Sequence, residues 1–573
     1  MSGLPAALWL LGLFAAAPAL RSGEEYGVVD RLRDALILGV AIPLVLGFVD
    51  LLYPAACWCA LALCLLAAFF RSGSARARRD VAPPYVLIAA LVVVAWPQLV
   101  RPLLDGDSLS YHLPNAATWV HAHSVWTTAT RYWWYPPASE LFASALYAVA
   151  TPFALPWCGL GALALLGFRI VAWARAYGAP SLLADALAAA TVTAYPIAIQ
   201  GGTLQNDAWL AAFWLETLWL TSSTKLTAPA PRTVAVTALL KPQGWILTAI
   251  ALIACKAPAR LWLAAAGAAS VWIARDAILW RGAGSASSGA PYANVLGSTI
   301  LAHGVPALAM LDRVALAASP FALLAFCAAL LGPAIAREPR RLGWAALGAA
   351  LLFLVLPFGY STSVAQLATG ASLRFAAPAI AAGAIVLARP ACRIAGIATA
   401  LLLASTLFGC IYVLNIFWND GSTHVAIAIA ALAVAVAAMA HLRRVAWPHA
   451  VAFGVAVIVA THLAARHPLD YYADALRVGE TSPGIYRWIE RERPAAIGGW
   501  GLRLGVVNVL SPATRTLDLP DDAACAQARR DGVLLAGVAE NDRPPEVNAR
   551  RLSDARACGR AIFDDPIGVV AQP

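Results

Sequence analysis

Residues 84–96 read PYVLIAALVVVAW, and residues 425–440 read VAIAIAALAVAVAAMA. Neither stretch carries a charged side chain, and both are continuously apolar instead of alternating between apolar and polar positions. Continuous runs of this kind are typical of transmembrane helices, whereas the strands of a membrane β-barrel would alternate. Similar runs recur along most of the chain. The sequence therefore predicts an all-α polytopic membrane protein.

The composition supports the same class. The 573 residues are 61% hydrophobic and 13% charged, with a mean hydropathy of +0.70. A soluble domain carries roughly 25% charged residues, so this chain has too few charges to cover a water-exposed surface. A soluble enzyme, a fibre and a disordered chain are excluded. The net charge of +10 predicts no nucleic-acid partner, because most Lys and Arg residues lie in short clusters between apolar runs.

These basic clusters predict the topology, since Lys and Arg mark the cytoplasmic ends of membrane spans. The strongest clusters are RSGSARARR (71–79), REPRR (337–341), the pair Arg389 and Arg393, and HLRR (441–444). Counting spans between them gives about 14–16 transmembrane helices. The polar segment from Asp105 to about Glu140 and the residues 466–573 then both lie outside the cytoplasm.

Two segments leave alternatives open. Residues 226–257 are long enough for two short crossings with Lys241 and Pro242 at the outer turn, or for one tilted crossing, and the basic CKAPAR that follows favours the hairpin. The first 20 residues are apolar but lack a basic start, so they form either a short extra span or a signal-like segment.

Three parts of the chain follow from this count. Residues 1–83 form an N-terminal membrane hairpin with the possible signal-like segment, and residues 84–465 form the main transmembrane domain with a first outer loop at 104–156. Residues 466–573 regain charge and alternate short apolar strands with amphipathic helices, which predicts a small extracytoplasmic α/β domain. Cys525 and Cys558 both lie in it, and their spacing leaves a disulfide open.

The first outer loop concentrates the polar residues that chemistry needs. Aspartate, histidine, arginine and glutamate side chains lie there among seven tryptophans and tyrosines, at positions Asp105, Asp107, His112, His121, His123, Arg131 and Glu140. Aromatic faces flanked by carboxylates suit a carbohydrate ring. An interfacial aromatic belt is the alternative interpretation. A divalent metal site also stays open, although the loop has no HExxH spacing.

Four motifs together resemble one enzyme family. DSLSYHLPNAATWV (107–120), followed by YPPASELF (135–142), resembles the first extracytoplasmic loop of the GT-C glycosyltransferases. The resemblance is closest to the family 39-like branch of protein O-mannosyltransferases and lipid A aminoarabinose transferases. LQNDAW (204–209), LLKPQGW (239–245) and SLRFAAPAI (372–380) are similar to its second outer loop, its Lys-Pro turn and its late Arg-aromatic element. The resemblance covers roughly residues 84–390.

Two features depart from the family pattern. The usual Asp-Glu pair after the first span reads Asp107-Ser108 here, which weakens a close substrate analogy. An additional hairpin also precedes the span at 84–103, and its purpose does not follow from the resemblance.

The resemblance implies an inverting transfer of a sugar from a polyprenyl phosphate, with Asp107 as the general base for the acceptor hydroxyl. Lys241, Arg374 and Arg131 are candidates for the donor phosphate, which Arg binds well because its fork is bidentate. The remaining candidate donor- or substrate-binding residues are Asp105, Tyr111, His112, Glu140 and Asp207. Each has a structural alternative: Asp107 and Asp207 as helix caps, Lys241 as a snorkelling residue, and Arg374 as a topology anchor.

The implied partners are a polyprenyl-phosphate sugar donor and a lipid, glycan or protein acceptor, with no metal ligand assigned. The implied location is the inner or plasma membrane of a bacterium, with the active site and the C-terminal domain extracytoplasmic. A transporter or flippase is the rival function, although the chain shows no internal repeat and its polar residues gather at one face instead of the midplane. A non-catalytic protein with the same fold is a third reading.

Overall fold

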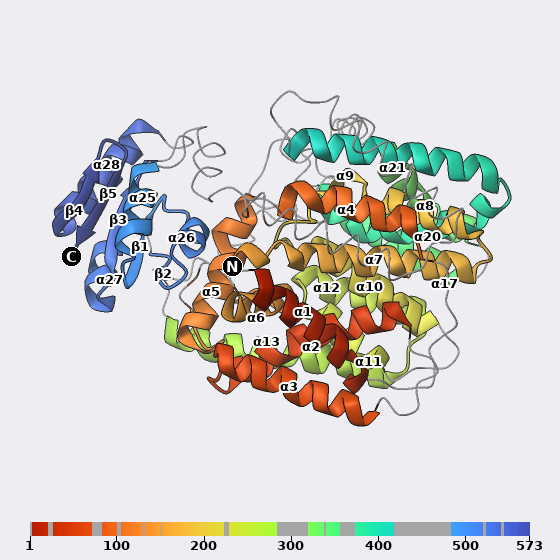
Figure 1. Cartoon of the computed structure of the whole chain (residues 1–573), viewed down its shortest axis with the longest axis horizontal. Coiled ribbons are helices and arrows are strands. Elements are labelled where there is room, and N and C mark those ends of the chain that lie inside the picture. The colour runs from red at the N-terminus through yellow and green to blue at the C-terminus, as the bar shows by residue number, and fades with distance from the viewer. Residues whose placement is uncertain are drawn as a thin grey trace.

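The computed structural model places a bundle of helices beside a small α/β domain that holds the C-terminus (Figure 1). The structure describes residues 3–20, 27–71, 83–99, 103, 105–128, 130, 132–150, 152–222, 229–283, 319–336, 340–355, 373–417, 483–519, 523–539 and 544–573. Two apolar stretches that the sequence predicts as spans, 424–441 and 446–464, lie outside these residues, as does the candidate residue Arg131.

The bundle is built from helices of 4 to 25 residues. In chain order they are α1 Gly3–Ala16, α2 Val28–Phe48, α3 Pro54–Arg71, α4 Tyr85–Leu99, α5 Leu113–Ala122, α6 Ala138–Val149, α7 Trp157–Ala176, α8 Ser181–Val192, α9 Tyr195–Ala198, α10 Asp207–Ser222, α11 Pro229–Ala238, α12 Pro242–Ala254, α13 Ala259–Ala283, α15 Pro320–Leu330, α16 Gly332–Ile335, α17 Arg340–Val355, α20 Ala377–Cys392 and α21 Ala395–Phe417. Two short turns matter for the site, the π-helical turn η3 at Ser108–His112 and the 3-10 turn η8 at Arg374–Ala376.

The predicted membrane class is confirmed. Among the described residues, five helices are long and apolar enough to cross a membrane, at Pro54–Arg71, Trp157–Ala176, Ala259–Trp280, Arg374–Cys392 and Ala395–Leu414. Large apolar side chains such as Phe69, Phe70 and Leu263 are more than 70% exposed on these helices, which is the surface that lipid requires. The protein is an integral membrane protein. The total of about 14–16 spans stays a prediction.

The ambiguous segment 226–257 is a hairpin. Helices α11 and α12 pack against each other, and Lys241 lies at the turn between them. At the other end of the bundle, Arg232 donates a hydrogen bond to the carbonyl of Leu20, 2.6 Å away, and Arg71 donates to Ala19. Basic residues therefore gather at one end, opposite Lys241.

The N-terminal hairpin is joined to the bundle by buried charges. Arg169 of α7 and Glu216 of α10 form a two-pronged ion pair with distances of 2.6 and 2.9 Å. Arg33 of α2 lies 3.8 Å from Glu216 and donates to Asp34 at 3.0 Å. Ionisable groups this deep in a membrane protein are costly unless they are paired. The network thus ties α2, α7 and α10 together.

The C-terminal part forms the predicted α/β domain. Its elements are α25 Pro483–Glu492, β1 Ala496–Trp500, α26 Leu504–Leu510, β2 Arg515–Leu517, α27 Ala524–Asp531, β3 Leu534–Val538, α28 Pro545–Cys558, β4 Arg560–Asp565 and β5 Gly568–Gln572. The sheet order is β2-β1-β3-β5-β4. Strand β1 pairs in parallel with β2 and β3, while β5 pairs antiparallel with β3 and β4.

Three details of this domain were open or wrong at the level of sequence. The sequence AIFDDPIGVVA (561–571) predicts one final strand, but it forms the hairpin β4–β5, because Asp565 accepts a hydrogen bond from the amide of Ile567 at 2.9 Å and forms a turn. Helix α26 was not predicted, since a seven-residue apolar stretch has no readable period. Cys525 and Cys558 form a disulfide that joins α27 to α28.

Candidate active site

The first outer loop begins with a turn that is fixed from two sides. Asp105 accepts hydrogen bonds from the amide of Ser108 at 2.8 Å and from the side chain of Gln205 at 3.2 Å. The Ser108 hydroxyl accepts from the amide of Leu204 at 2.8 Å. Asp105 therefore caps the turn η3, while Asp107 makes no capping hydrogen bond. The geometry does not support the cap interpretation of Asp107 and leaves its carboxylate free for other contacts.

Four charged side chains from four distant segments meet beside this turn. Arg374 of η8 forms an ion pair with Asp107, and its Nε lies 3.3 Å from Oδ2 of Asp207 at the start of α10. Oδ1 of Asp207 accepts from the ammonium of Lys241 at 2.6 Å. The charges alternate in sign along this row and cancel. We call Asp107, Arg374, Asp207 and Lys241 the charge row.

The charge row is open at one end only. The side chain of Asp107 is 35% exposed, whereas those of Arg374, Lys241 and Asp207 are 10%, 5% and 2% exposed. Lys241 thus points at a carboxylate in the interior and does not snorkel, and Arg374 pairs with two aspartates instead of standing alone at a span end. Phe375 covers both cations, with its ring 4.7 Å from Nζ of Lys241 and 5.1 Å from the Arg374 guanidinium.

The two aspartates of the loop have opposite protonation tendencies. Burial raises the pKa of Asp107, but the adjacent Arg374 guanidinium, together with His112 and Lys241, outweighs burial, so the pKa ends below its ordinary value. Burial raises the pKa of Asp105 above its ordinary value, although the amide of Ser108 opposes this. Of the two aspartates, Asp107 therefore holds its proton less tightly.

A second buried pair closes the far end of the turn. Nδ1 of His112 donates to Oε1 of Glu140 at 2.6 Å, and the Ser139 hydroxyl donates to Oε2 at 2.8 Å. His112 and Glu140 are each 1% exposed. The contact joins η3 to α6, so these two predicted binding residues support the turn from behind.

Aromatic rings gather on the open side of the turn. Tyr111 lies 4.8 Å from the ring of Tyr132 and 6.1 Å from that of Tyr135, measured between centroids. Trp134 lies 4.7 Å from Tyr135. All four rings are partly exposed. The predicted juxtaposition of aromatic faces with carboxylates is therefore present in the part of the loop that the structure describes.

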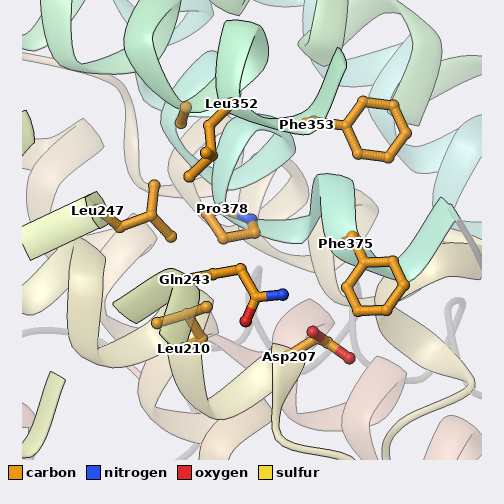
Figure 2. A pocket seen from close by; sticks show the side chains of 9 residues that line it. Asp207, Leu210, Gln243, Leu247, Leu352, Phe353, Phe375 and Pro378 are labelled. Carbon is orange, nitrogen blue, oxygen red and sulfur yellow. The ribbon is translucent and has the colours of Figure 1, made fainter. Parts of the chain in front are cut away.

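A pocket starts at the buried end of the charge row (Figure 2). It lies between α10, α12, α17 and the start of α20, and its lining is Asp207, Leu210, Gln243, Leu247, Ala349, Leu352, Phe353, Phe375 and Pro378. Asp207 and Gln243 form its polar end, and the other seven residues are apolar. Oδ2 of Asp207, Nε of Arg374 and Oε1 of Gln243 are buried and make no hydrogen bond in the described structure. The pocket thus combines an apolar wall with buried polar atoms at one end, where Oδ2 of Asp207 lies 3.3 Å from Nε of Arg374.

Sequence reasoning missed several contributors. Gln243 and Phe375 carry no charge, so their importance follows only from what they touch. Arg275 had a readable signal, because Arg275 and its ion-pair partner Asp276 are the only charged residues in the stretch 261–280 of helix α13. It is fully buried and donates to the carbonyls of Val125 and Trp133 at 3.0 and 2.8 Å. Arg275 thereby holds the outer loop. Within the described residues, no group of three or more His, Cys, Asp or Glu side chains converges as a metal site would require.

Comparison with known proteins gives the following. No family model matches the chain, and no curated protein matches it. Two solved structures are similar, both of ArnT from Cupriavidus metallidurans, one in the apo state and one bound to undecaprenyl phosphate. Each has 14% identity and covers 85% of this chain and 97% of ArnT, with TM-scores of 0.49 and 0.48. At this level of similarity no residue's role follows from ArnT, and what the site can do follows from its own residues.

Proposed function

We propose that the protein is a membrane glycosyltransferase that moves a sugar from a polyprenyl-phosphate donor to an acceptor hydroxyl. One observation carries the proposal: the charge row, with its two buried cations, runs from Asp207 in the wall of an apolar pocket to the partly exposed carboxylate of Asp107. A polyprenyl-phosphate sugar needs these three features, an apolar wall for the chain, cations for the phosphate and a base for the acceptor.

In this proposal the donor phosphate binds between Lys241 and Arg374. Arg374 offers a donor, Nε, which lies 3.3 Å from Oδ2 of Asp207 and makes no hydrogen bond among the described residues. The leucines and phenylalanines of the pocket would contact the first prenyl units. In the donor-free site the aspartates neutralise the cations, so phosphate competes with Asp107 and Asp207 for them. Binding therefore rearranges the charge row.

This competition sets the basicity of Asp107. Arg374 lowers the pKa of Asp107 in the free site, which makes the carboxylate a weak base. When the phosphate draws the guanidinium away, the pKa of Asp107 returns toward its ordinary value and the carboxylate becomes a better proton acceptor. The site would thus activate its base only after the donor is bound.

The reaction balances with the groups on hand. The acceptor oxygen attacks C1 of the sugar, and its proton passes to Asp107. The bond between C1 and the phosphate oxygen breaks, and its electron pair stays on the phosphate, where Lys241 and Arg374 offset the new charge. The attack comes from the face opposite the phosphate, so the configuration at C1 inverts. The rings of Tyr111, Tyr132, Trp134 and Tyr135 are suited to stack on a sugar beside this centre.

The orientation in the membrane follows from the two ends of the bundle. Arg71 and Arg232 lie at the end opposite the charge row, and clustered arginines favour the cytoplasmic side. We therefore place the charge row and the C-terminal domain outside the cytoplasm, in the inner or plasma membrane of a bacterium. Cysteine labelling from either side of sealed vesicles tests this placement.

The function is tested with purified full-length protein and a panel of polyprenyl-phosphate sugars, by following release of polyprenyl phosphate. Asp107→Asn removes the base and keeps the shape, and we expect transfer to fall by about 10²–10⁴-fold. Asp50→Asn is the matched control, because Asp50 is exposed in the α2–α3 turn with a positive φ of 58° that asparagine tolerates. Wild-type transfer by the Asp107 variant would show that Asp107 is not the base. Movement of the intact donor across the membrane would favour a flippase.

A further inference from the structure

Helix α26 of the C-terminal domain packs directly against the turn that carries Asp107. All seven residues from Leu504 to Leu510 are buried, and the helix contacts both η3 and α5. Figure 1 shows α26 at the side of its domain that faces the bundle, next to α5. An apolar helix that a small domain leaves on its outer side must be covered by something else. Here the active-site turn covers it.

Gly505 brings the two backbones into contact. A Cβ atom at this position would lie 2.5 Å from the carbonyl oxygen of Leu109 and 2.6 Å from its Cα. Both neighbours are backbone atoms, which cannot rotate away. Leu109 lies two residues after Asp107 in the turn. Only glycine lets α26 approach the turn this closely.

A second contact lies just beyond α26. The carbonyl of Pro512 accepts hydrogen bonds from the Tyr147 hydroxyl at 2.9 Å and from Nε2 of His121 at 2.6 Å. Tyr147 belongs to α6, the helix whose Glu140 holds His112 at the end of the turn. The C-terminal domain therefore contacts both the turn Ser108–His112 and helix α6, which supports that turn.

We propose that the C-terminal domain is a positioning element of the active site, which holds the turn Ser108–His112 so that Asp107 meets Arg374. Gly505 and Tyr147 are positioning residues, since neither touches the charge row. The proposal rests on the proposed function for its catalytic consequence, but the restraint on the turn is a property of the fold alone.

The expected effect is on turnover instead of donor affinity. The donor pocket is built from α10, α12, α17 and the start of α20, and none of these helices forms the contact with α26 at Gly505 or Pro512. A displacement of about 1 Å between a catalytic group and its substrate can lower a rate by roughly 10²-fold. Loosening the turn should therefore lower kcat while KM for the donor stays near its wild-type value.

The test compares Gly505→Ala with Gly537→Ala in the full-length protein. The second variant crowds Ala555 at 3.0 Å inside the C-terminal domain, away from the turn. Tyr147→Phe is a third variant that removes only one hydroxyl and so avoids a folding defect. Hydrogen exchange of residues 105–112 is measured together with kcat and KM for a polyprenyl-phosphate sugar.

We expect faster exchange in residues 105–112 and a kcat lower by about 10²-fold in Gly505→Ala, smaller changes of the same kind in Tyr147→Phe, and neither in Gly537→Ala. Unchanged exchange in both Gly505→Ala and Tyr147→Phe would overturn the positioning role. So would equal effects of Gly505→Ala and Gly537→Ala. A wild-type protein inactive on every donor would overturn the proposed function, while the exchange result would still decide the restraint.

Discussion

The ion pair between Lys241 and Asp207 gives the sharpest quantitative prediction. Their 2.6 Å separation, at 5% and 2% exposure, corresponds to roughly 6 kcal/mol of attraction at an effective dielectric constant of about 20. Removing each ion from water costs several kcal/mol, so the intact pair contributes little net stability. Removing one partner alone strands a buried charge and should cost about 3–5 kcal/mol.

We therefore predict that Lys241→Met and Asp207→Asn each destabilise the protein strongly, while the double variant is more stable than either single one. Asp207→Asn should be the more damaging change, because it also removes the carboxylate that lies 3.3 Å from Nε of Arg374. Binding of polyprenyl phosphate should be lost in the double variant even though it folds, since one of the two phosphate-binding cations is gone.

The assay is denaturant unfolding of the four proteins in detergent, combined with binding of polyprenyl phosphate to each. A coupling energy of roughly 2–3 kcal/mol between the two substitutions is expected from a buried charge pair. Additive effects, within about 0.5 kcal/mol, would refute the electrostatic reasoning. Wild-type affinity of the double variant would refute the role of Lys241 in phosphate binding.

Three further predictions concern other parts of the molecule. Because Arg374 lowers the pKa of Asp107 in the free site, kcat/KM should fall only below the ordinary aspartate pKa of about 4, whereas kcat, which reports the donor-bound site, should fall at a higher pH. Arg374→Gln should shift the acid side of the kcat/KM profile to higher pH, and an unshifted profile would contradict this. Arg275→Gln leaves the carbonyls of the outer loop without their donor and should destabilise the protein by about 1–3 kcal/mol, with faster hydrogen exchange at 124–134; unchanged exchange would show that the loop holds itself. Cys525→Ser opens the disulfide across a 33-residue separation, so Cys558 should become reactive toward thiol-specific labels and the free energy of unfolding should fall by roughly 3–4 kcal/mol. Equal labelling of Cys558 in the wild-type protein would show that this cysteine is already free.

The sequence predicted the parts of the fold that depend on local hydropathy. The apolar runs, the hairpin at 226–257 and the return of charge after Arg466 each mark how one segment partitions between lipid and water, and the described structure has helices or an α/β domain accordingly. It was less successful inside the C-terminal domain. There α26 and the β4–β5 hairpin depend on short segments whose periodicity is too brief to read.

The candidate residues could be chosen by type, because a charge beside a membrane span is rare and costly. Which of these residues group together in space could not be predicted from the sequence. Asp107 and Arg374 are separated by 267 positions in the chain, and only helix packing decides that Arg374 faces Asp107 and Asp207 at once. His112 and Glu140 were predicted to bind donor or substrate. Their 2.6 Å contact and 1% exposure place them behind the turn, in a supporting position.

By itself, then, the sequence determined the membrane class, the order of apolar and polar segments, and the few charges worth following. Each of these depends only on how a single segment partitions between lipid and water. The tertiary structure alone decided which charges neutralise each other, where an apolar pocket meets them, and that Gly505 of a distant domain rests on the turn beside Asp107. Those features arise between segments, where close packing and charge compensation select one arrangement out of many that the same hydropathy pattern allows.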